Sequence, residues 1–225
     1  MGGYPRAANS AGRTGVVVVY AVPGQDCSSC SAGGLTPDTY PGWVCAVADG
    51  LRGTRTAVVL EPDALAELGA CSGQGDRLGL LGGAVTTPTA ARTTVCLDAG
   101  HSGWVDAATT VSRLRAAGIS GARGFATNVS AFQTSADERV CAEQVSAGTG
   151  GAGYVIDTSR NGASATSEFC NPAGRKLGVA PALVADGSHQ DANLWVNRVG
   201  ESDGSCNGGP PAVQCWPGFA VSLAG

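Results

Sequence analysis

The 225-residue sequence has few charged residues, few aromatic residues and only two histidines. Lys and Arg number 14 against 18 Asp and Glu, so the net charge of −4 offers no basic footprint, and we expect no nucleic-acid partner. No apolar run approaches the roughly 18 residues that cross a membrane, so we expect no membrane partner. The first residues, MGGYPRAANS, lack the apolar centre of a signal peptide, so any export signal has been removed or was never there.

Cysteine, in contrast, is abundant, with nine residues. That number is typical of a protein secreted into an oxidising compartment, and an odd count leaves at least one thiol unpaired. The stretch CSSC, from Cys27 to Cys30, has the spacing of a zinc or redox motif, but the chain has no second CxxC to complete four ligands. We therefore expect no metal and no cofactor.

The pattern of apolar runs predicts an α/β protein. Apolar residues make up 43% of the chain and charged residues 14%, which is typical of a globular protein. Short apolar runs alternate with helix-compatible stretches, which indicates a parallel sheet covered on both faces, either open or closed into a barrel. The expected strands are 16–20, 57–60, 93–97, 123–127, 153–157 and 193–197, and the expected helices are 40–53, 63–73, 108–118 and 135–148. We expect a short N-terminal segment, 1–15, and a single domain, 16–225.

Polar side chains follow each of these strands, where the sites of parallel α/β folds lie. They are Asp26, Glu61, Asp63, Asp98, His101, Asn128, Asp157, Arg160, Glu201 and Asp203. Each also has an ordinary local interpretation: Asp63 is a good N-cap for the expected helix, and Asp203 suits a turn before a glycine. Six polar loops at one edge nevertheless predict a functional site.

Two other site motifs fit poorly. GESDG makes Ser202 a candidate nucleophile, but both histidines precede it, whereas an α/β-hydrolase needs one later in the chain. GTGGAG, 148–153, precedes a strand instead of opening a helix, which argues against dinucleotide binding. Paired carboxylates without a metal or a nucleophile indicate glycosidic bond hydrolysis. In such a pair Asp63, after an apolar strand, suits the protonated role, and Asp203, in a polar glycine-rich loop, suits the ionised role.

Seven ordered segments resemble the motifs of glycoside hydrolase family 6, the inverting β-1,4-glucanases. They are VVVVYAVPGQDC, VVLEPDALA, CLDAGHSGWV, ARGFATNVS, YVIDTSRNG, EFCNPAGRKLG and LWVNRVGESDG. The resemblance implies a distorted (β/α) barrel of parallel strands. Only some fifteen residues precede the first strand, where family members carry a further strand unit, so we expect an incomplete barrel without that unit.

The resemblance also implies roles for individual residues. Asp63 would be the general acid, Asp26 the acid that tunes its pKa, and Asp203 the debated base. The residues implied to bind substrate are Tyr20, Asp98, His101, Trp104, Asn128, Phe169, Asn197 and Glu201. The disulfides implied are Cys27 with Cys71 and Cys170 with Cys206, with Cys215 a rival partner for Cys170; the other cysteines have no implied role.

Four positions depart from the family pattern. Gln25 replaces an arginine, Asn197 a lysine and Phe169 a tryptophan, while Ala32 stands where a serine that helps hold the catalytic water is usual. These changes would weaken binding of the ground state, the transition state or both.

We therefore predict a secreted, monomeric enzyme that hydrolyses β-1,4-glucan, a polysaccharide substrate, with inversion. Endo action is favoured because segments 128–135 and 178–192 are short for tunnel-forming loops. The alternatives are a glucan-binding relative with weak or no catalysis, an exo-acting cellobiohydrolase, and an intracellular enzyme on another β-glucan.

Overall fold

The computed structural model describes residues 3–29, 31–87 and 92–225. Its strands are β1 (Gly15–Val19), β2 (Thr56–Leu60), β3 (Thr93–Asp98), β4 (Gly124–Thr127), β5 (Gly153–Asp157), β6 (Ala182–Leu183) and β7 (Gln190–Leu194). Its α-helices are α1 (Gly3–Ser10), α2 (Tyr40–Gly50), α3 (Arg77–Thr86), α4 (Ala107–Ala116), α5 (Ser135–Gly148) and α6 (Pro217–Ala224). Two short 3₁₀ turns, η1 (Asp26–Ser28) and η2 (Ile119–Gly121), complete the elements.

The strands form one sheet in the order β1-β2-β3-β4-β5-β7-β6. β1 pairs with β2, β2 with β3 and β5 with β7 in parallel, and β6 pairs antiparallel with β7. The order has two ends, so within the described residues the barrel is incomplete, as predicted. The α/β fold class is confirmed.

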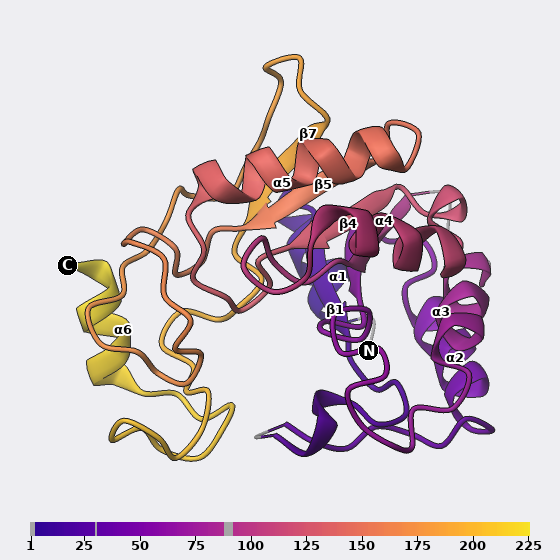
Figure 1. Cartoon of the computed structure of the whole chain (residues 1–225). Coiled ribbons are helices and arrows are strands. Elements are labelled where there is room, and N and C mark those ends of the chain that lie inside the picture. Colours follow the sequence, from indigo (N-terminus) through magenta and orange to yellow (C-terminus); the bar gives the residue numbers. More distant parts are fainter. Residues whose placement is uncertain (1–2, 30, 88–91) are drawn as a thin grey trace. The chain divides into compact units, whose positions relative to one another are not determined.

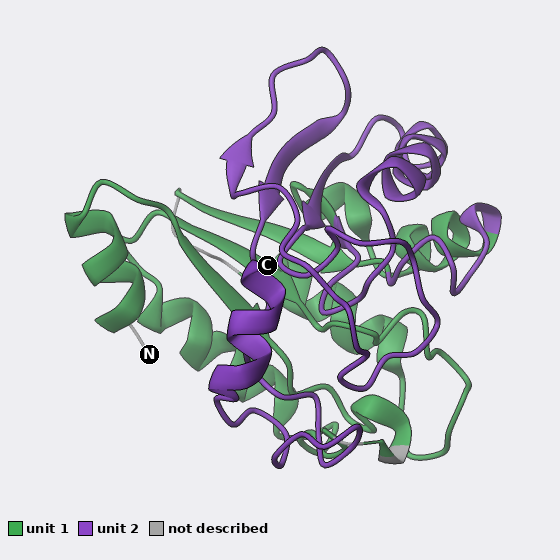
Figure 2. Ribbon diagram, turned by 90° about the vertical axis from the view of Figure 1, so that its left-hand side faces the viewer, with its two compact units in different colours: residues 1–99, 109–125 green, residues 100–108, 126–225 purple. Residues whose placement is uncertain are grey.

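Two compact units make up the chain, shown in different colours in Figure 2. Unit 1 holds residues 1–99 and 109–125, and unit 2 holds residues 100–108 and 126–225. In unit 1, α2 packs against α3, and in unit 2, α5 packs along β5 (Figure 1). No helix of the described residues is both long enough and apolar enough to cross a membrane.

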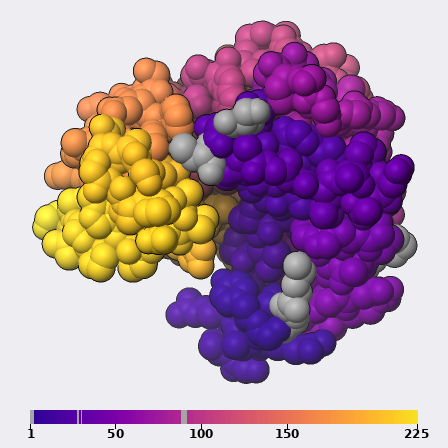
Figure 3. Space-filling model, turned by 90° about the horizontal axis from the view of Figure 1, so that it is seen from below, coloured from indigo at the N-terminus to yellow at the C-terminus, as the bar shows by residue number. Residues whose placement is uncertain are grey.

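Among the described residues, each unit contains one disulfide, and both are the predicted pairs. Cys27 bonds Cys71 in unit 1, and Cys170 bonds Cys206 in unit 2, which excludes Cys215 as the partner of Cys170. The second bond joins the segment around residue 170 to the C-terminal segment, and the two lie side by side in orange and yellow in Figure 3. A further bond there runs from the Leu177 N–H to the Leu223 carbonyl, at 2.9 Å. Cys30 lies outside the described residues.

Three of the four predicted helices are present as α2, α4 and α5. The helix predicted over 63–73 is wrong: these residues form turns and bends instead. The backbone enters the segment with positive φ at Glu61 (51°) and Asp63 (67°), which is incompatible with a right-handed helical turn there. The helix begins later, at α3, after Asp76, whose carboxylate accepts the Gly79 N–H at 3.0 Å as an N-cap.

The sixth predicted strand, 193–197, is shifted: β7 ends at Leu194. The reason is the carboxylate of Asp157, which accepts the N–H groups of Val196 (3.2 Å) and Asn197 (3.4 Å) in place of a neighbouring strand. Strand β6 was not predicted, because two exposed residues carry no alternating pattern.

Candidate active site

Glu61, at the end of β2, fastens two strand ends together in unit 1. Its side chain is buried, and one carboxylate oxygen accepts the N–H groups of Ala21 and Val22, both at 2.9 Å. Burial raises the pKa of Glu61, and these backbone donors oppose that rise. Glu61 therefore holds the segment after β1 against the end of β2.

Asp63 is held in place through its backbone. Its N–H donates to Oδ1 of Asp98 at 3.0 Å, and its carbonyl accepts the Glu67 N–H at 2.8 Å. Asp98 is 1% exposed, so its oxygen is a fixed internal support. No helix begins directly after Asp63, where the chain forms turns, so the N-cap interpretation is wrong and the carboxyl is not used by a helix end.

The carboxyl group of Asp63 has an unusual proton affinity. Desolvation, followed by the negative charges of Glu67 and Asp26, raises its pKa to about 7, while a hydrogen bond from Tyr20 opposes the rise. The Tyr20 hydroxyl lies 3.5 Å from Oδ2 of Asp63. An aspartic acid with this pKa carries a transferable proton close to neutral pH, as a general acid requires.

Asp26 lies in a strained turn beside the first disulfide. Both Asp26 (φ 55°) and Cys27 (φ 38°) have left-handed backbone conformations. Oδ2 of Asp26 accepts the N–H and the hydroxyl of Ser31, both at 2.6 Å. The Gln25 side chain in turn donates to the Ser31 carbonyl at 2.7 Å, so Gln25 anchors this loop.

Sequence reasoning missed Ser31. A serine was sought six residues after Asp26, where Ala32 stands, but the serine that contacts the carboxylate is five residues after it. A search that allowed a one-residue shift would have found it. The Ser31 hydroxyl also lies 3.4 Å from that of Tyr20.

Arg77 was also missed, because an arginine opening an otherwise apolar helix gives no distinct signal. Its side chain is 1% exposed and donates to the carbonyls of Pro23 and Gly24, both at 2.8 Å, and to that of Ala64 at 3.1 Å. The first two carbonyls lie just before Asp26, and the third lies just after Asp63. Arg77 thus holds both loops with one buried guanidinium.

In unit 2, Asp203 forms an ion pair with Arg160. The side chains are 15% and 2% exposed, and Nη1 of Arg160 lies 2.8 Å from Oδ1 of Asp203. Oδ2 accepts the Asn171 N–H at 2.9 Å, and the guanidinium lies 4.4 Å from the ring centre of Phe132. The carboxylate therefore has fixed partners for its charge, with lone pairs left over, because a carboxylate offers about four acceptor positions.

The polar residues predicted to bind substrate in unit 2 all have protein partners. Asn128 is fully buried, and its amide donates to the carbonyls of Asp157 (2.9 Å) and Gln133 (3.2 Å). Asn197 donates to the Ser130 hydroxyl at 3.0 Å, and Glu201 pairs with Arg198. These contacts show what fixes each side chain.

Three rings predicted to contact substrate also lie in unit 2. Trp104 and Phe169 are 44% and 65% exposed, so flat apolar faces are open to solvent, as stacking on a sugar ring requires. The ring centre of His101 lies 5.4 Å from that of Trp104. Nδ1 of His101 accepts the Gly103 N–H at 3.2 Å and desolvation lowers the pKa of His101, so the neutral ring has its proton on Nε2.

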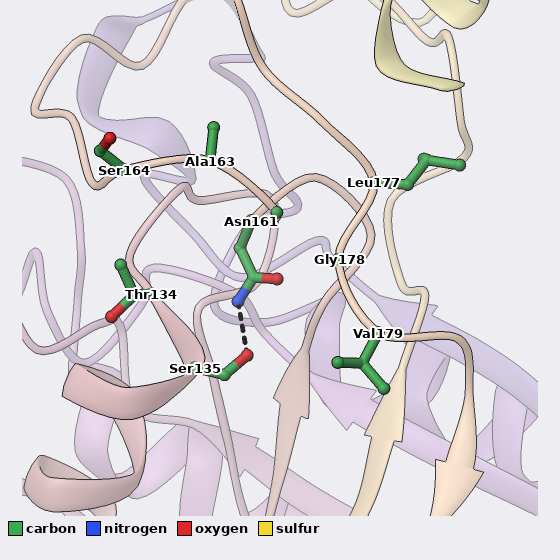
Figure 4. Close-up of a pocket in the computed structure, with 9 residues that line it drawn as sticks. Thr134, Ser135, Asn161, Ala163, Ser164, Leu177, Gly178 and Val179 are labelled. Carbon is green, nitrogen blue, oxygen red and sulfur yellow. Dashed lines mark hydrogen bonds between the residues drawn. The ribbon is translucent and has the colours of Figure 1, made fainter. Parts of the chain in front are cut away.

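A separate groove in unit 2 has a volume of about 630 Å³. It is lined by Thr134, Ser135, Asn161, Gly162, Ala163, Ser164, Leu177, Gly178 and Val179 (Figure 4). None of the predicted site residues lines it, and none of the lining residues is charged. Among the residues that the structure describes, no group of three or more His, Cys, Asp or Glu could hold a metal ion.

Comparisons with known proteins identify the family. The sequence model described as "Glycosyl hydrolases family 6" matches residues 1–224, and the chain belongs to that family, as the motifs predicted. Endoglucanase A of Cellulomonas fimi is 50% identical over 98% of this chain. Endoglucanase 1 of Streptomyces halstedii is 36% identical over 99% of it.

A solved relative has the same fold. The structure of the endoglucanase Cel6 from Mycobacterium tuberculosis, in complex with methyl-cellobiosyl-4-deoxy-4-thio-β-D-cellobioside, is 42% identical and superposes with a TM-score of 0.93. The match covers 98% of this chain and 78% of that one. This chain spans 49% of the length of the Cellulomonas enzyme and 72% of the Streptomyces enzyme.

Proposed function

We propose that this protein hydrolyses β-1,4-glucosidic bonds of cellulose or a related β-glucan, with inversion and by endo action. Family membership and relatives named endoglucanases support the reaction class. The observation that carries the proposal is the Asp63 carboxyl, whose pKa is raised to about 7 by desolvation and by the charges of Glu67 and Asp26.

In the proposed reaction, Asp63 gives its proton to the glycosidic oxygen as the bond from that oxygen to the anomeric carbon breaks. The leaving sugar keeps the bonding electron pair as a hydroxyl group. A water molecule attacks the opposite face of the anomeric carbon and loses a proton to Asp203, directly or through a second water, which inverts the configuration. Asp63 then recovers a proton from solvent, and Asp203 releases the proton it accepted to solvent, which restores both groups.

Asp26 tunes the acid in this proposal. Its negative charge raises the pKa of Asp63, and Ser31 holds the Asp26 carboxylate in position. Ser31 also takes over the position for which the family motif predicts a serine, so the change at Ala32 does not remove that hydroxyl from the loop. Tyr20, with its hydroxyl on Asp63, is proposed to contact the sugar at the cleaved bond.

The remaining candidates are proposed to bind the glucan chain. Trp104 and Phe169 would stack on sugar faces, because both rings are open to solvent. His101 would donate from Nε2 to a sugar hydroxyl. Hydrogen bonding to hydroxyls is proposed for Asn197 and Glu201. Asp98 and Asn128 are buried, so we propose that they position the segments that carry the site instead of touching the glucan chain.

Replacement of Asp63 tests the role of the acid. Asp63→Asn should reduce hydrolysis of cellohexaose by at least about 100-fold, because the alkoxide leaving group then departs without a proton. An aryl cellobioside with an acidic phenol should lose much less activity, because its leaving group needs little protonation. Equal rates of the parent and the variant on cellohexaose would refute the assignment. The matched control Asp38→Asn changes an exposed acid of the same unit.

Product analysis tests stereochemistry and the mode of attack. Early products from cellohexaose should be α-anomers by NMR, and the viscosity of a soluble cellulose derivative should fall faster than reducing ends appear. Cellobiose as the sole early product would establish exo action instead. A crystal structure with a bound oligosaccharide should place the carboxyl groups of Asp63 and Asp203 about 6.5–9.5 Å apart.

A second candidate function is glucan binding with little turnover. The ion pair between Asp203 and Arg160 favours it, because a carboxylate engaged by a guanidinium has fewer positions left for a water molecule. Calorimetric titration with cellotetraose, alongside the hydrolysis assay, separates the two functions. Tight binding with equal, low turnover in the parent and Asp63→Asn would favour the binding function.

We also propose that the protein works outside the cell as a monomer. Two disulfides support an oxidising compartment, since the cytosol keeps most thiols reduced. Sedimentation in dilute buffer should give the mass of one chain. Full stability in a strong thiol reductant would argue against the extracellular assignment.

A further inference from the structure

Glu138, in α5, is a buried acid that the proposed reaction does not use. Its side chain is fully buried in unit 2. Oε1 accepts the Ser102 N–H at 2.8 Å, and Oε2 contacts the Thr127 hydroxyl. Glu138 therefore connects α5 to the end of β4 and to the segment Gly100–Trp104, which carries His101 and Trp104.

The two oxygen contacts of Thr127 indicate which protonation state of Glu138 satisfies both as hydrogen bonds. The Thr127 oxygen contacts both Oε2 of Glu138 and, at 3.1 Å, the Gly100 carbonyl. A hydroxyl has one proton to donate. Both contacts become hydrogen bonds only if Thr127 donates to Gly100 and Glu138 carries a proton on Oε2 that it donates to Thr127.

The surroundings of Glu138 favour the same form. Within the residues that the structure describes, no cation pairs with Glu138, and an ionised carboxylate buried without one is costly. Burial raises the pKa of Glu138, the charge of Asp137 adds to the rise, and the Ser102 and Thr127 donors oppose it. Cys141 on the same helix has its pKa raised by burial, by Glu138 and by Asp106 of the 100–108 segment. The charge of Asp137 thus disfavours the ionised form of Glu138.

We propose that Glu138 is a positioning residue which, as a neutral carboxylic acid, holds the segment Gly100–Trp104 and thereby the rings of His101 and Trp104. The part of this proposal that concerns glucan rests on the proposed function, whereas the positioning itself does not. Glutamine is the matched replacement, because its carbonyl can accept from Ser102 and its amide can donate to Thr127 in the pattern of the protonated acid.

Imidazole NMR of His101 tests the positioning without any substrate. At pH values below the pKa of Glu138, the His101 signals of the parent and Glu138→Gln should coincide, and those of Glu138→Ala should shift. Above the pKa of Glu138 the parent signals should move while those of Glu138→Gln stay constant. Signals in Glu138→Gln that match Glu138→Ala, or signals in Glu138→Ala that match the parent, would overturn the proposal.

A second pair of variants covers the case in which Glu138→Ala does not fold. Thr127→Ser keeps the hydroxyl and should leave the His101 signals unchanged, whereas Thr127→Val should displace them. In the cellohexaose hydrolysis assay, Thr127→Val should raise KM about tenfold with kcat within about twofold, the effect of losing about one buried hydrogen bond. Equal KM values for the two variants would contradict the proposal, and a parent without hydrolysis would refute the proposed function alone, because the NMR result stands by itself.

Discussion

At the residue scale, replacement of Asp63 and replacement of Asp203 should change the stability of the protein in opposite directions. The pKa of Asp63 in the folded protein, about 7, lies above its unfolded value of about 3.9, so the folded state retains a proton that the unfolded chain releases. The contribution of Asp63 to stability therefore falls as the pH rises from about 4 to about 7. Asp63→Asn removes this penalty.

We expect Asp63→Asn to raise the thermal midpoint relative to the parent, and to raise it more at pH 8 than at pH 4. Calorimetry at both pH values measures the difference. Asp38→Asn, in an exposed loop, should show the same small effect at both. A difference in midpoint between Asp63→Asn and the parent that falls as the pH rises would mean that the Asp63 carboxyl is ionised and stabilised in the folded parent.

Asp203→Asn should instead destabilise the protein. It leaves the 2%-exposed guanidinium of Arg160 without a counter-charge, and breaking a buried ion pair in this way costs about 3–5 kcal/mol. Urea unfolding measures the loss. The exposed pair of Arg52 and Asp49 is the control, since Asp49→Asn should cost under about 1 kcal/mol.

At the element scale, α3 tests how local backbone preferences act in this fold. Gly83 lies inside the helix with open space where a Cβ would stand, so Gly83→Ala should stabilise the protein by about 0.5–1 kcal/mol. At Gly79 a Cβ would lie 2.1 Å from the Asp76 carboxylate that caps the helix. Gly79→Ala should therefore gain nothing, because loss of the cap cancels the gain in propensity. If urea unfolding showed the same gain in free energy of unfolding for Gly79→Ala and Gly83→Ala, the capping role of Asp76 would be contradicted.

The same scale explains the wrongly predicted helix. Residues 63–73 have helix-like composition, but Glu61 and Asp63 adopt positive φ, and their backbone and side chains bond to Ala21, Val22 and Asp98 from distant segments. Local propensity is weaker than several such bonds together. The prediction of α5 succeeded because the local signals agree with the tertiary contacts. Thr134 caps the helix by accepting the Asp137 N–H, and the apolar pattern of the helix agrees with its packing on β5.

At the scale of the whole molecule, each compact unit has its own covalent link. The disulfides span sequence separations of 44 and 36 residues, and each should contribute about 4 kcal/mol by limiting the unfolded chain. Cys27→Ser with Cys71→Ser should also lower kcat, because Cys27 follows Asp26 directly. Cys170→Ser with Cys206→Ser should lower the free energy of unfolding by a similar amount to the first double variant. Guanidinium unfolding measures the loss of stability in both variants, and hydrolysis assays measure kcat. Unchanged kcat in the first double variant would show that the bond does not position Asp26.

The sequence by itself determined the α/β class, most strands, three helices and the family. The family resemblance implied both disulfide pairs, and the structure decided between Cys206 and Cys215 as the partner of Cys170. Strand periodicity and ordered motifs are properties of short segments, so they can be read without coordinates. Only the tertiary structure decided which partners the buried polar groups have. Glu61 bonds the segment after β1, and Ser31 and Arg77 support the loops of the acids. Asp203 pairs with Arg160, and Glu138 holds the His101 segment. Most of these contacts join residues that are distant in sequence, and the contact of Ser31 depends on the geometry of its loop. Burial also shifts the pKa of the acidic side chains, and no local pattern encodes burial.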